Sequence, residues 1–265
     1  MPKTIVIPLD GSARAEAALA PGVWLSDRLG ADLLLVTSTF AVDPVQEEAI
    51  LQRGLDATSS SRASARVLRG RFAARAIVDA ANDAPASLIC MATSGKGSLE
   101  TKLLGSVTDE VLALSRTPIV LVGPGCKPWS GIGDGTVVCV EQASDPRTRV
   151  ARVGTLPLEL GLTVHTVTVH PPGREWTTEI PVDAAEWTAE VLRQRGVDAI
   201  DHDLADNDVA PAILALVREV DARFLAIAAN HPSHGGKDLP FGRVGSKLVR
   251  EAPCPIIVQH LPAEE

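Results

Sequence analysis

The segment between residues 91 and 107 contains the residue types that bind phosphate. It reads Met-Ala-Thr-Ser-Gly-Lys-Gly-Ser-Leu-Glu-Thr-Lys-Leu-Leu-Gly-Ser-Val, and an apolar helical pattern begins at its last residue. Glycines such as Gly95 and Gly105 let backbone amides approach an anion closely, and a helix N-terminus supplies unpaired donors and a favourable dipole. Ser106 adds a hydroxyl donor at the same place. The segment therefore predicts a phosphate site at the start of this helix.

A carboxylate follows the first apolar run of the chain, which ends at Asp10. Ligands of open α/β sheets bind outside the carboxyl ends of the strands, where Asp10 is expected to lie. Beside phosphates, a carboxylate is suited to ribose hydroxyls or to Mg²⁺. A purely structural interpretation also remains open, in which Asp10 and Ser12 cap a helix, Gly95 and Gly105 form tight turns, and the site is empty.

These residues must be positioned by short apolar runs that alternate with helical patterns. The runs are apolar on both sides rather than alternating, which is typical of strands covered by helices on both faces. Pro21 is expected to kink the first helix because it lacks a backbone donor. The first half predicts helices at 13–29, 44–58, 73–82 and 107–116, and strands at 3–10, 33–36, 65–69, 88–92 and 119–122.

The second half repeats this order. Thr117-Pro118-Ile119-Val120 and Cys254-Pro255-Ile256-Ile257 lie 137 residues apart, as do Gly105-x-Val107 and Gly242-x-Val244. We therefore expect an α/β protein with two tandem, doubly wound, parallel five-stranded sheets. The expected domains are 1–124 and 135–265, joined by a Gly/Pro-rich linker at 125–134. The second domain predicts strands at 136–141, 163–169, 197–204, 224–228 and 256–258, and helices at 145–159, 178–195 and 209–220.

At this point the residues show a resemblance. The first half resembles a universal stress protein domain, and the whole chain resembles a tandem universal stress protein. This resemblance implies that both sheets are of the Rossmann-like, adenine-nucleotide-binding type. The matching pieces are Pro8-Leu9-Asp10-Gly11-Ser12, Gly95-x9-Gly105-Ser106 and Thr117-Pro118-Ile119-Val120. The nucleotide-binding branch of that family shows Gly-x2-Gly-x9-Gly-Ser/Thr, and Ala92 stands where its first glycine would be. Alanine keeps the backbone N–H and adds one methyl group, so it weakens the match without breaking it.

The resemblance implies that the first half binds ATP, with or without Mg²⁺, as a cytoplasmic regulatory or sensing module in stress adaptation. It also implies that the fifth strands, Ile119–Val122 and Ile256–Gln259, pair into a pseudo-dimer within the chain, and it leaves further homodimerisation open. The implied ligand residues are Pro8, Leu9 and Asp10 on the nucleoside side, Ser38 at the adenine, Met91 and Ala92 near adenine and ribose, and Gly95, Gly105, Ser106 and Val107 at the phosphates.

The second half departs from this pattern at the positions that would touch phosphate. Pro232 stands at the position of Gly95, and Arg243 at the position of Ser106. Proline offers no N–H, and an arginine places a long guanidinium where a small hydroxyl would be. Glu141 replaces Asp10. We therefore predict no ATP binding there, with Arg243 either filling the pocket and pairing with Glu141 or accepting a smaller anion.

Composition excludes several other classes of function. The chain has 265 residues, of which 45% are hydrophobic and 22% charged, and its net charge of −8 gives no basic footprint for nucleic acid. The longest apolar runs are far shorter than the roughly 20 residues that span a bilayer. No signal-peptide pattern is visible near residue 1, so a cytoplasmic location is expected.

Other chemistry is weakly supported. His231-Pro-Ser-His234 lies in a Pro/Gly-rich run without a third ligand nearby, so a solvated loop is favoured over a metal site. The four cysteines form no C-x-x-C pair, and Cys90 and Cys139 lie in apolar runs typical of buried thiols. No histidine accompanies the glycine segment and no residue there is an obvious activator of water, so no catalytic residue is assigned. Two alternatives to ATP binding stay open: an interaction scaffold without nucleotide, and a slow Mg²⁺-dependent nucleotide hydrolase.

Overall fold

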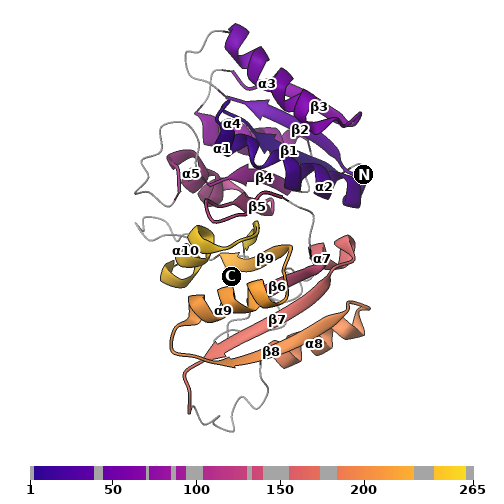
Figure 1. Ribbon diagram of the computed structural model, residues 1–265. Helices are drawn as coiled ribbons and strands as arrows, with labels where there is room; N and C mark the ends of the chain where they lie inside the picture. The colour runs from indigo at the N-terminus through magenta and orange to yellow at the C-terminus, as the bar shows by residue number, and fades with distance from the viewer. Residues whose placement is uncertain are drawn as a thin grey trace, which may run out of the picture. The chain divides into compact units, whose positions relative to one another are not determined.

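The computed structural model describes residues 3–38, 44–69, 72–84, 88–93, 104–129, 133–139, 155–173, 184–229 and 242–260. The chain divides into two compact units, Met1–Pro124 and Gly125–Glu265. Each unit is built around a parallel β-sheet with helices packed against it (Figure 1). The expected α/β class with two tandem, doubly wound sheets is confirmed.

The N-terminal unit has its strands in the spatial order β3-β2-β1-β4-β5, and every neighbouring pair is parallel. Helix α2 packs on α3, and α4 packs on α5. The chain moves outward from β1 to β3 and then returns to β4, so right-handed crossovers place these two helix pairs on opposite faces. The elements are β1 (Thr4–Pro8), α1 (Ala13–Glu16), α2 (Leu19–Leu29), β2 (Asp32–Thr37), α3 (Pro44–Thr58), β3 (Ala63–Val67), α4 (Ala73–Asp83), β4 (Leu88–Ala92), α5 (Ser106–Leu114) and β5 (Ile119–Val122).

Strands β1, β4 and β5 contribute fully buried side chains to the core of this unit. Ile5, Ile7, Ile89 and Val120 are fully buried, as expected for strands covered on both faces. Because the strand order reverses between β1 and β4, a crevice is expected outside their carboxyl ends, and this is the edge where the candidate ligand residues lie.

The first predicted helix differs from expectation at Pro21. Instead of one kinked helix over 13–29, two helices form, with a turn at Ala17 and Ala18 between them. Pro21 thereby falls in the first turn of α2, where its missing N–H has no intrahelical partner to lose. In a continuous helix, its ring would have met the carbonyl of Ala17. The break relieves that clash.

The C-terminal unit repeats the arrangement in the order β8-β7-β6-β9-β10, again with parallel neighbours. The predicted helix at 145–159 falls within the described residues only from Thr155 onward. The elements are β6 (Gly135–Cys139), α7 (Thr155–Leu160), β7 (Thr163–His170), α8 (Ala184–Gln194), β8 (Ala199–Ala205), α9 (Val209–Glu219), β9 (Phe224–Ala229), α10 (Gly242–Glu251) and β10 (Ile256–His260).

The Gly/Pro-rich segment expected as a linker packs on the C-terminal unit over its described residues. Trp129 packs against Phe224 in a tilted arrangement with ring centroids 5.6 Å apart, and the Arg223 guanidinium lies 5.4 Å from the centroid of the Trp129 ring. Arg223 Nε donates to the carbonyl of Gly133 at 2.6 Å, and Lys127 N donates to that of Pro253 at 3.0 Å. An aromatic side chain and these hydrogen bonds fix a segment whose composition alone suggests flexibility.

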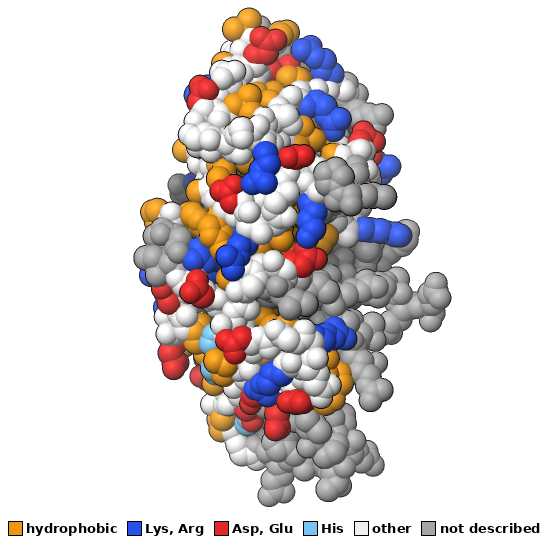
Figure 2. Space-filling model, turned by 90° about the vertical axis from the view of Figure 1, so that its right-hand side faces the viewer, with side chains coloured by type: hydrophobic (Ala, Val, Ile, Leu, Met, Phe, Trp, Pro, Cys, Tyr) orange, Lys and Arg blue, Asp and Glu red, His pale blue; other side chains and the backbone are white. Residues whose placement is uncertain are grey.

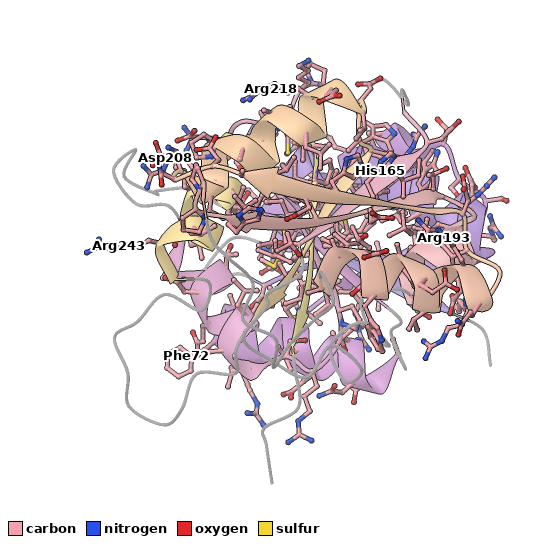
Figure 3. All side chains as sticks on the ribbon, turned by 90° about the horizontal axis from the view of Figure 1, so that it is seen from below. Phe72, His165, Arg193, Asp208, Arg218 and Arg243 are labelled. Atoms are coloured by element: carbon pink, nitrogen blue, oxygen red, sulfur yellow. The ribbon has the colours of Figure 1, made fainter. Side chains whose placement is uncertain are left out.

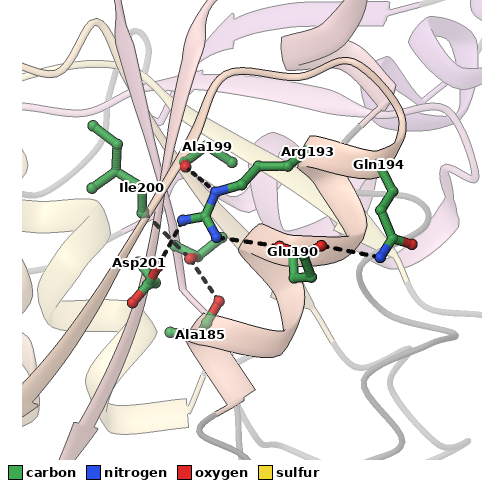
Figure 4. A network of polar contacts seen from close by, with 8 residues as sticks. Ala185, Glu190, Arg193, Gln194, Ala199, Ile200 and Asp201 are labelled. Atoms are coloured by element: carbon green, nitrogen blue, oxygen red, sulfur yellow. Dashed lines mark hydrogen bonds and ion pairs between the residues drawn. The ribbon is translucent and has the colours of Figure 1, made fainter.

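Helix α8 is held to the edge strand β8 by a polar network (Figure 4). Arg193 donates from Nε to the carbonyl of Ala199 and from Nη2 to Asp201, both at 2.8 Å, and pairs with Glu190. The Asp201 carboxylate raises the pKa of the Arg193 guanidinium through this hydrogen bond. The network fixes the helix against β8, which is the last strand at its edge of the sheet among the described residues.

On the face drawn in Figure 2, positively charged Lys and Arg side chains are interspersed with negatively charged Asp and Glu, so neither sign of charge dominates that face. Among the described residues, no helix is long and apolar enough to cross a membrane.

Candidate functional site

The end of β1 is fixed by its neighbours. Pro8 pairs with Val36 of β2, and Leu9 N donates to the carbonyl of Val36 at 2.8 Å, which continues the ladder one residue beyond the strand. The side chain of Leu9 is buried under α3, since a Cβ added at Gly54 would lie 2.6 Å from Leu9 Cδ1. Because its N–H and its side chain are both engaged in these contacts, Leu9 holds the next residue, Asp10, in place. Leu9 can contact a ligand only through its backbone carbonyl.

Asp10 takes part in a tight local network at the start of α1. Its Oδ1 accepts from Ser12 N at 2.9 Å and from Ser12 Oγ at 2.6 Å. Ser12 Oγ in turn accepts from Ala15 N at 3.1 Å, which makes Ser12 the N-cap of the helix. The capping role expected of Ser12 is thus real, and it fixes the Asp10 carboxylate in one orientation at the sheet edge.

Gly11 makes this arrangement possible. Its φ of +77° lies in the left-handed region, and an added Cβ would lie 2.8 Å from Ile50 Cγ1 of α3. Only glycine combines that conformation with so close an approach by a neighbouring helix. The Asp-Gly-Ser sequence is therefore a turn that presents a fixed carboxylate beside β1.

The end of β4 is joined by hydrogen bonds to β5 on one side and to the start of α5 on the other. Thr93 N donates to the carbonyl of Val122 at 3.1 Å, and Thr93 O accepts from Gly105 N at 2.8 Å. Thr108 Oγ1 donates to the carbonyl of Ala92 at 3.2 Å. The start of the helix is thereby held beside the carboxyl end of the strand, although the intervening chain from residue 94 to 103 lies outside the described residues.

These bonds change the role expected of Gly105. Its amide donates to Thr93, so Gly105 acts as the N-cap that places α5, with φ −70° and ψ 154°. The amides of Ser106, Val107 and Thr108 form the first helical turn, which has no intrahelical acceptors. The first intrahelical bond runs from Asp109 N to Gly105 O at 3.0 Å.

The first turn of α5 is accessible to a ligand. Ser106 and Val107 are exposed, with Val107 at 37%, and no side chain caps the turn. A turn of open amides with the positive end of the helix dipole is suited to an anion. Thr93 and Thr108 were missed by sequence reasoning. The sequence shows a hydroxyl residue, Thr108, two positions after Ser106. It does not show that this hydroxyl bonds to the carbonyl of Ala92 in β4.

The sheet brings the remaining described candidates to the same edge. Register pairs of β1 with β4 and with β2 place Pro8–Asp10 between Met91–Ala92 on one side and Ser38 on the other. Met91 is buried, with 4% of its surface exposed, so its side chain is part of the floor of this edge. Gly95 lies outside the described residues.

The corresponding position in the C-terminal unit looks different. Helix α10 begins at Gly242, with φ +59°, and the Arg243 side chain is exposed and points away from the ribbon (Figure 3). Glu141 and Pro232 lie outside the described residues, so the predicted pairing of Arg243 with Glu141 stays a prediction.

The surroundings of Cys90, Cys139 and Cys254 are typical of structural rather than reactive thiols. Cys90 is buried and its Sγ lies 3.4 Å from the carbonyl of Ala18. Burial raises the pKa of Cys139 to about 12 and raises that of Cys254 as well. Both thiols therefore stay protonated at neutral pH, which does not suit nucleophilic chemistry.

Comparisons with known proteins match the whole architecture. A sequence model of the universal stress protein family matches residues 1–123 and again 137–260. The chain is 34% identical over 135 residues to "Universal stress protein in QAH/OAS sulfhydrylase 3'region" of Thermus aquaticus, covering 45% of this chain and 98% of that protein.

Two solved structures match over nearly the full length and show the same fold. A universal stress protein from Archaeoglobus fulgidus DSM 4304 has a TM-score of 0.69 at 19% identity, with 98% of each chain covered. A putative universal stress protein from Pseudomonas aeruginosa UCBPP-PA14 has a TM-score of 0.67 at 14% identity, with 97% of this chain and 93% of that chain covered. This chain belongs to the universal stress protein family and carries the family's domain twice.

Proposed function

We propose that the N-terminal unit binds ATP at the carboxyl edge of its sheet, where the first turn of α5 takes the phosphates. The observation that supports this best is the open turn at Ser106, Val107 and Thr108, held to β4 by Gly105 and Thr108. Amides fixed before the ligand arrives lose little conformational freedom on binding. The remaining donors would come from Gly95 and its neighbours.

The nucleoside would lie along the ends of β1, β2 and β4. Asp10 would accept hydrogen bonds from ribose hydroxyls or approach Mg²⁺, since its carboxylate is held in place by Ser12. Ser38 would contact adenine through its backbone, and Pro8, Leu9, Met91 and Ala92 would form the surface beneath adenine and ribose. The burial of Leu9 and Met91 and the strand pairing of Pro8, Met91 and Ala92 support a rigid floor rather than a mobile one.

The C-terminal unit would hold no ATP, so each chain binds one nucleotide. In this proposal the fifth strands of the two domains pair into a pseudo-dimer, and the protein acts in the cytoplasm as a regulatory module. Nucleotide in the N-terminal unit would change its contacts with a protein partner. Hydrolysis is not required for this role.

The first experiment asks whether nucleotide is present at all. The full chain is purified without added nucleotide, denatured, and its supernatant examined by mass spectrometry. ATP or ADP near one equivalent per chain supports the proposal. A nucleotide-free protein that also fails to bind added ATP supports the scaffold alternative instead.

The decisive variants are two substitutions at Ser106. Ser106→Ala removes only the hydroxyl, whereas Ser106→Pro removes the hydroxyl and the amide hydrogen. Proline suits the first helical position, and Gly105 already has the extended conformation that must precede it. We expect Ser106→Pro to weaken ATP binding at least about tenfold, Ser106→Ala to weaken it less, and the folded structure to be kept in both.

The matched control is Arg243→Ala at the corresponding position of α10. Its side chain is exposed, so the fold should be unaffected, and ATP affinity should equal that of the parent chain. If Ser106→Pro retains full affinity while Arg243→Ala loses it, the nucleotide binds in the other unit and the proposal is wrong.

A further inference from the structure

Two cysteines that are far apart in the sequence come close together in the C-terminal unit. Cys126 follows the first residue of that unit, and Cys254 lies between α10 and β10. Lys127 N donates to the carbonyl of Pro253 at 3.0 Å. This bond joins the two segments of backbone on which the cysteines lie, and neither thiol is part of a disulfide.

The hydrogen bond sets the distance between the two cysteine Cα atoms. The described peptide bonds are trans, so Cys126 Cα lies on the same side of its peptide bond as the Lys127 N–H. For the same reason, Cys254 Cα lies on the same side as the Pro253 oxygen. Standard bond lengths then place the two Cα atoms about 4–7 Å apart, however the two peptide planes are turned. Disulfides join Cα atoms about 4.4–6.8 Å apart, so the backbone already has the spacing that a disulfide requires.

The side chains of the two cysteines are also neighbours. Burial has the largest effect on the pKa of the Cys254 thiol and raises it, and the charges of the Cys126 thiol and the Asp221 carboxylate raise it further. An electrostatic effect of one thiol on the other requires that the two side chains lie near each other. The proximity of the two residues therefore extends from their backbones to their sulfur atoms.

The segment around Cys126 is held against the end of α10. A Cβ added at Gly125 would lie 2.8 Å from the carbonyl oxygen of Arg250 and 3.0 Å from that of Ala252. Together with the hydrogen bond from Lys127, this close approach fixes the backbone on both sides of Cys126. A thiol held in this way loses little conformational freedom when it reacts with a neighbouring thiol.

The two thiols differ in their access to solvent. Cys126 is half-buried, whereas only 6% of Cys254 is exposed. A small oxidant in solution therefore meets Cys126 first. The N-terminal repeat has Thr117 at the position of Cys254, so the fold itself does not require a thiol there.

We propose that Cys126 and Cys254 form an oxidation-responsive pair, which closes to a disulfide in the presence of a peroxide. The Cys126 thiolate attacks one peroxide oxygen, so that an S–O bond forms, the O–O bond breaks and hydroxide leaves. The Cys254 sulfur then attacks the sulfur of the resulting sulfenic acid. The S–S bond forms as the S–O bond breaks, and the Cys254 proton leaves with the hydroxyl group as water. Two thiols and one hydrogen peroxide thus give one disulfide and two water molecules.

The raised pKa of Cys254 is compatible with this order of steps. A buried, protonated thiol does not react with peroxide by itself, so Cys254 stays reduced until Cys126 is oxidised. The sulfenic acid of Cys126 is then held next to it. This proximity gives an effective concentration far above that of a thiol in solution, which compensates for the small thiolate fraction of Cys254.

The disulfide would enclose almost the whole C-terminal unit, because its described strands and helices from β6 to α10 lie between the two cysteines in the sequence. A cross-link that closes so long a loop strongly restricts the unfolded chain. The oxidised form is therefore expected to resist heat better than the reduced form. The site shares no residue with the proposed nucleotide site and does not depend on it.

The test uses the full chain, first reduced and then treated with hydrogen peroxide. Remaining thiols are alkylated before mass spectrometry of the denatured, unreduced protein. We expect the chain to lose two alkylation sites and two hydrogen atoms, and its digest to contain a peptide pair in which Cys126 is joined to Cys254. Dithiothreitol should restore both alkylation sites. Calorimetry should show that oxidation raises the unfolding midpoint of the C-terminal unit by at least about 5 °C.

Two variants separate the roles of the thiols. Cys126→Ser should form neither the sulfenic acid nor the disulfide. Cys254→Thr, which copies the N-terminal repeat, should stop at the sulfenic acid of Cys126, which dimedone labels. The matched control is Cys139→Ser, because it removes a different thiol whose pKa is raised by burial, and it should form the disulfide as fully as the parent chain.

The parent chain alone decides the main point, so the result does not depend on how well a variant folds. A folded parent chain that keeps all its alkylation sites after peroxide treatment would overturn the proposal, as would a disulfide that joins other cysteines or two separate chains. An equal loss of alkylation sites in well-folded Cys126→Ser, or no disulfide in well-folded Cys139→Ser, would also overturn it. An unchanged unfolding midpoint in the oxidised parent chain would overturn the stabilising role.

Discussion

At the residue scale, the candidate nucleotide site depends on glycines and threonines that position other groups. Gly11 turns the chain so that Ser12 can fix Asp10, and Thr108 fastens α5 to the end of β4. The sequence predicted that Gly105 and Ser106 start a helix at the sheet edge. It did not reveal that the Gly105 amide is used internally, because its acceptor, Thr93, is identified only by the path of the chain.

The first prediction concerns Gly11. Gly11→Ala should lower the free energy of unfolding by about 2 kcal/mol, because a left-handed φ costs an L-residue about 1 kcal/mol and the new methyl group meets Ile50. Urea denaturation of the full chain measures it. Gly30→Ala is the control: its φ of +63° is similar, but no atom lies within 4 Å of its added Cβ, so the loss should be nearer 1 kcal/mol. Equal losses would show that the contact with Ile50 does not matter.

The second prediction concerns Ser12, which caps α1 and holds Asp10. Ser12→Ala should cost about 1 kcal/mol of stability through the lost cap. Because the Asp10 carboxylate then loses both its fixed orientation and one hydrogen-bond donor, ATP affinity should fall as well. Ser12→Asp keeps a cap but brings a second carboxylate next to Asp10, so it should retain stability and still bind ATP poorly. Calorimetric titration measures the affinities, and full affinity in both variants would exclude Asp10 as a ligand.

At the element scale, apolar periodicity predicted most of the strands and helices, and β4 and β5 have the predicted bounds. Apolar periodicity gave the wrong bounds for one helix and one strand. The helix predicted over 13–29 is divided at Ala17 because of Pro21, and the strand predicted at 65–69 forms at Ala63–Val67. The side chains of this edge strand, Ala-Ser-Ala-Arg-Val, are largely exposed. The sequence therefore has no pattern of buried apolar residues from which the bounds of the strand could be predicted.

The third prediction tests the close approach of α3 to the sheet. Gly54→Val should lower stability by about 1–3 kcal/mol, because the added side chain would overlap Leu9 and Leu35, which form the surface under α3. Gln52→Ala, an exposed position on the same helix, should change stability by less than about 0.5 kcal/mol. Thermal unfolding of both variants compares them. If Gly54→Val is as stable as Gln52→Ala, the helix is not in close contact with the strands.

At the scale of the whole molecule, duplication predicted two domains of one fold, and the family match to both halves supports this. The residues at 125–129 and 133–134 were expected only as a linker, yet those residues pack on the C-terminal unit. Glycine and proline content could not show that Trp129 meets Arg223 and Phe224. Likewise, no spacing rule pairs Cys126 with Cys254, because only the path of the chain brings them together.

The fourth prediction tests that packing. Trp129→Ala should destabilise the C-terminal unit by about 1–2 kcal/mol, the sum expected for an aromatic pair and a cation–π contact. Hydrogen exchange should therefore accelerate in β9. Exchange in α3 of the N-terminal unit should be unchanged. Unaltered exchange in β9 would show that the segment contributes nothing to that unit.

The most direct test of the central claim is an isothermal titration of the nucleotide-free full chain with Mg·ATP. The account predicts one ATP per chain, with an affinity at least about tenfold weaker in Ser106→Pro and unchanged in Arg243→Ala. Two equivalents per chain, or none, would contradict it. Full ATP affinity in Ser106→Pro would equally contradict the assignment of the phosphates to the start of α5.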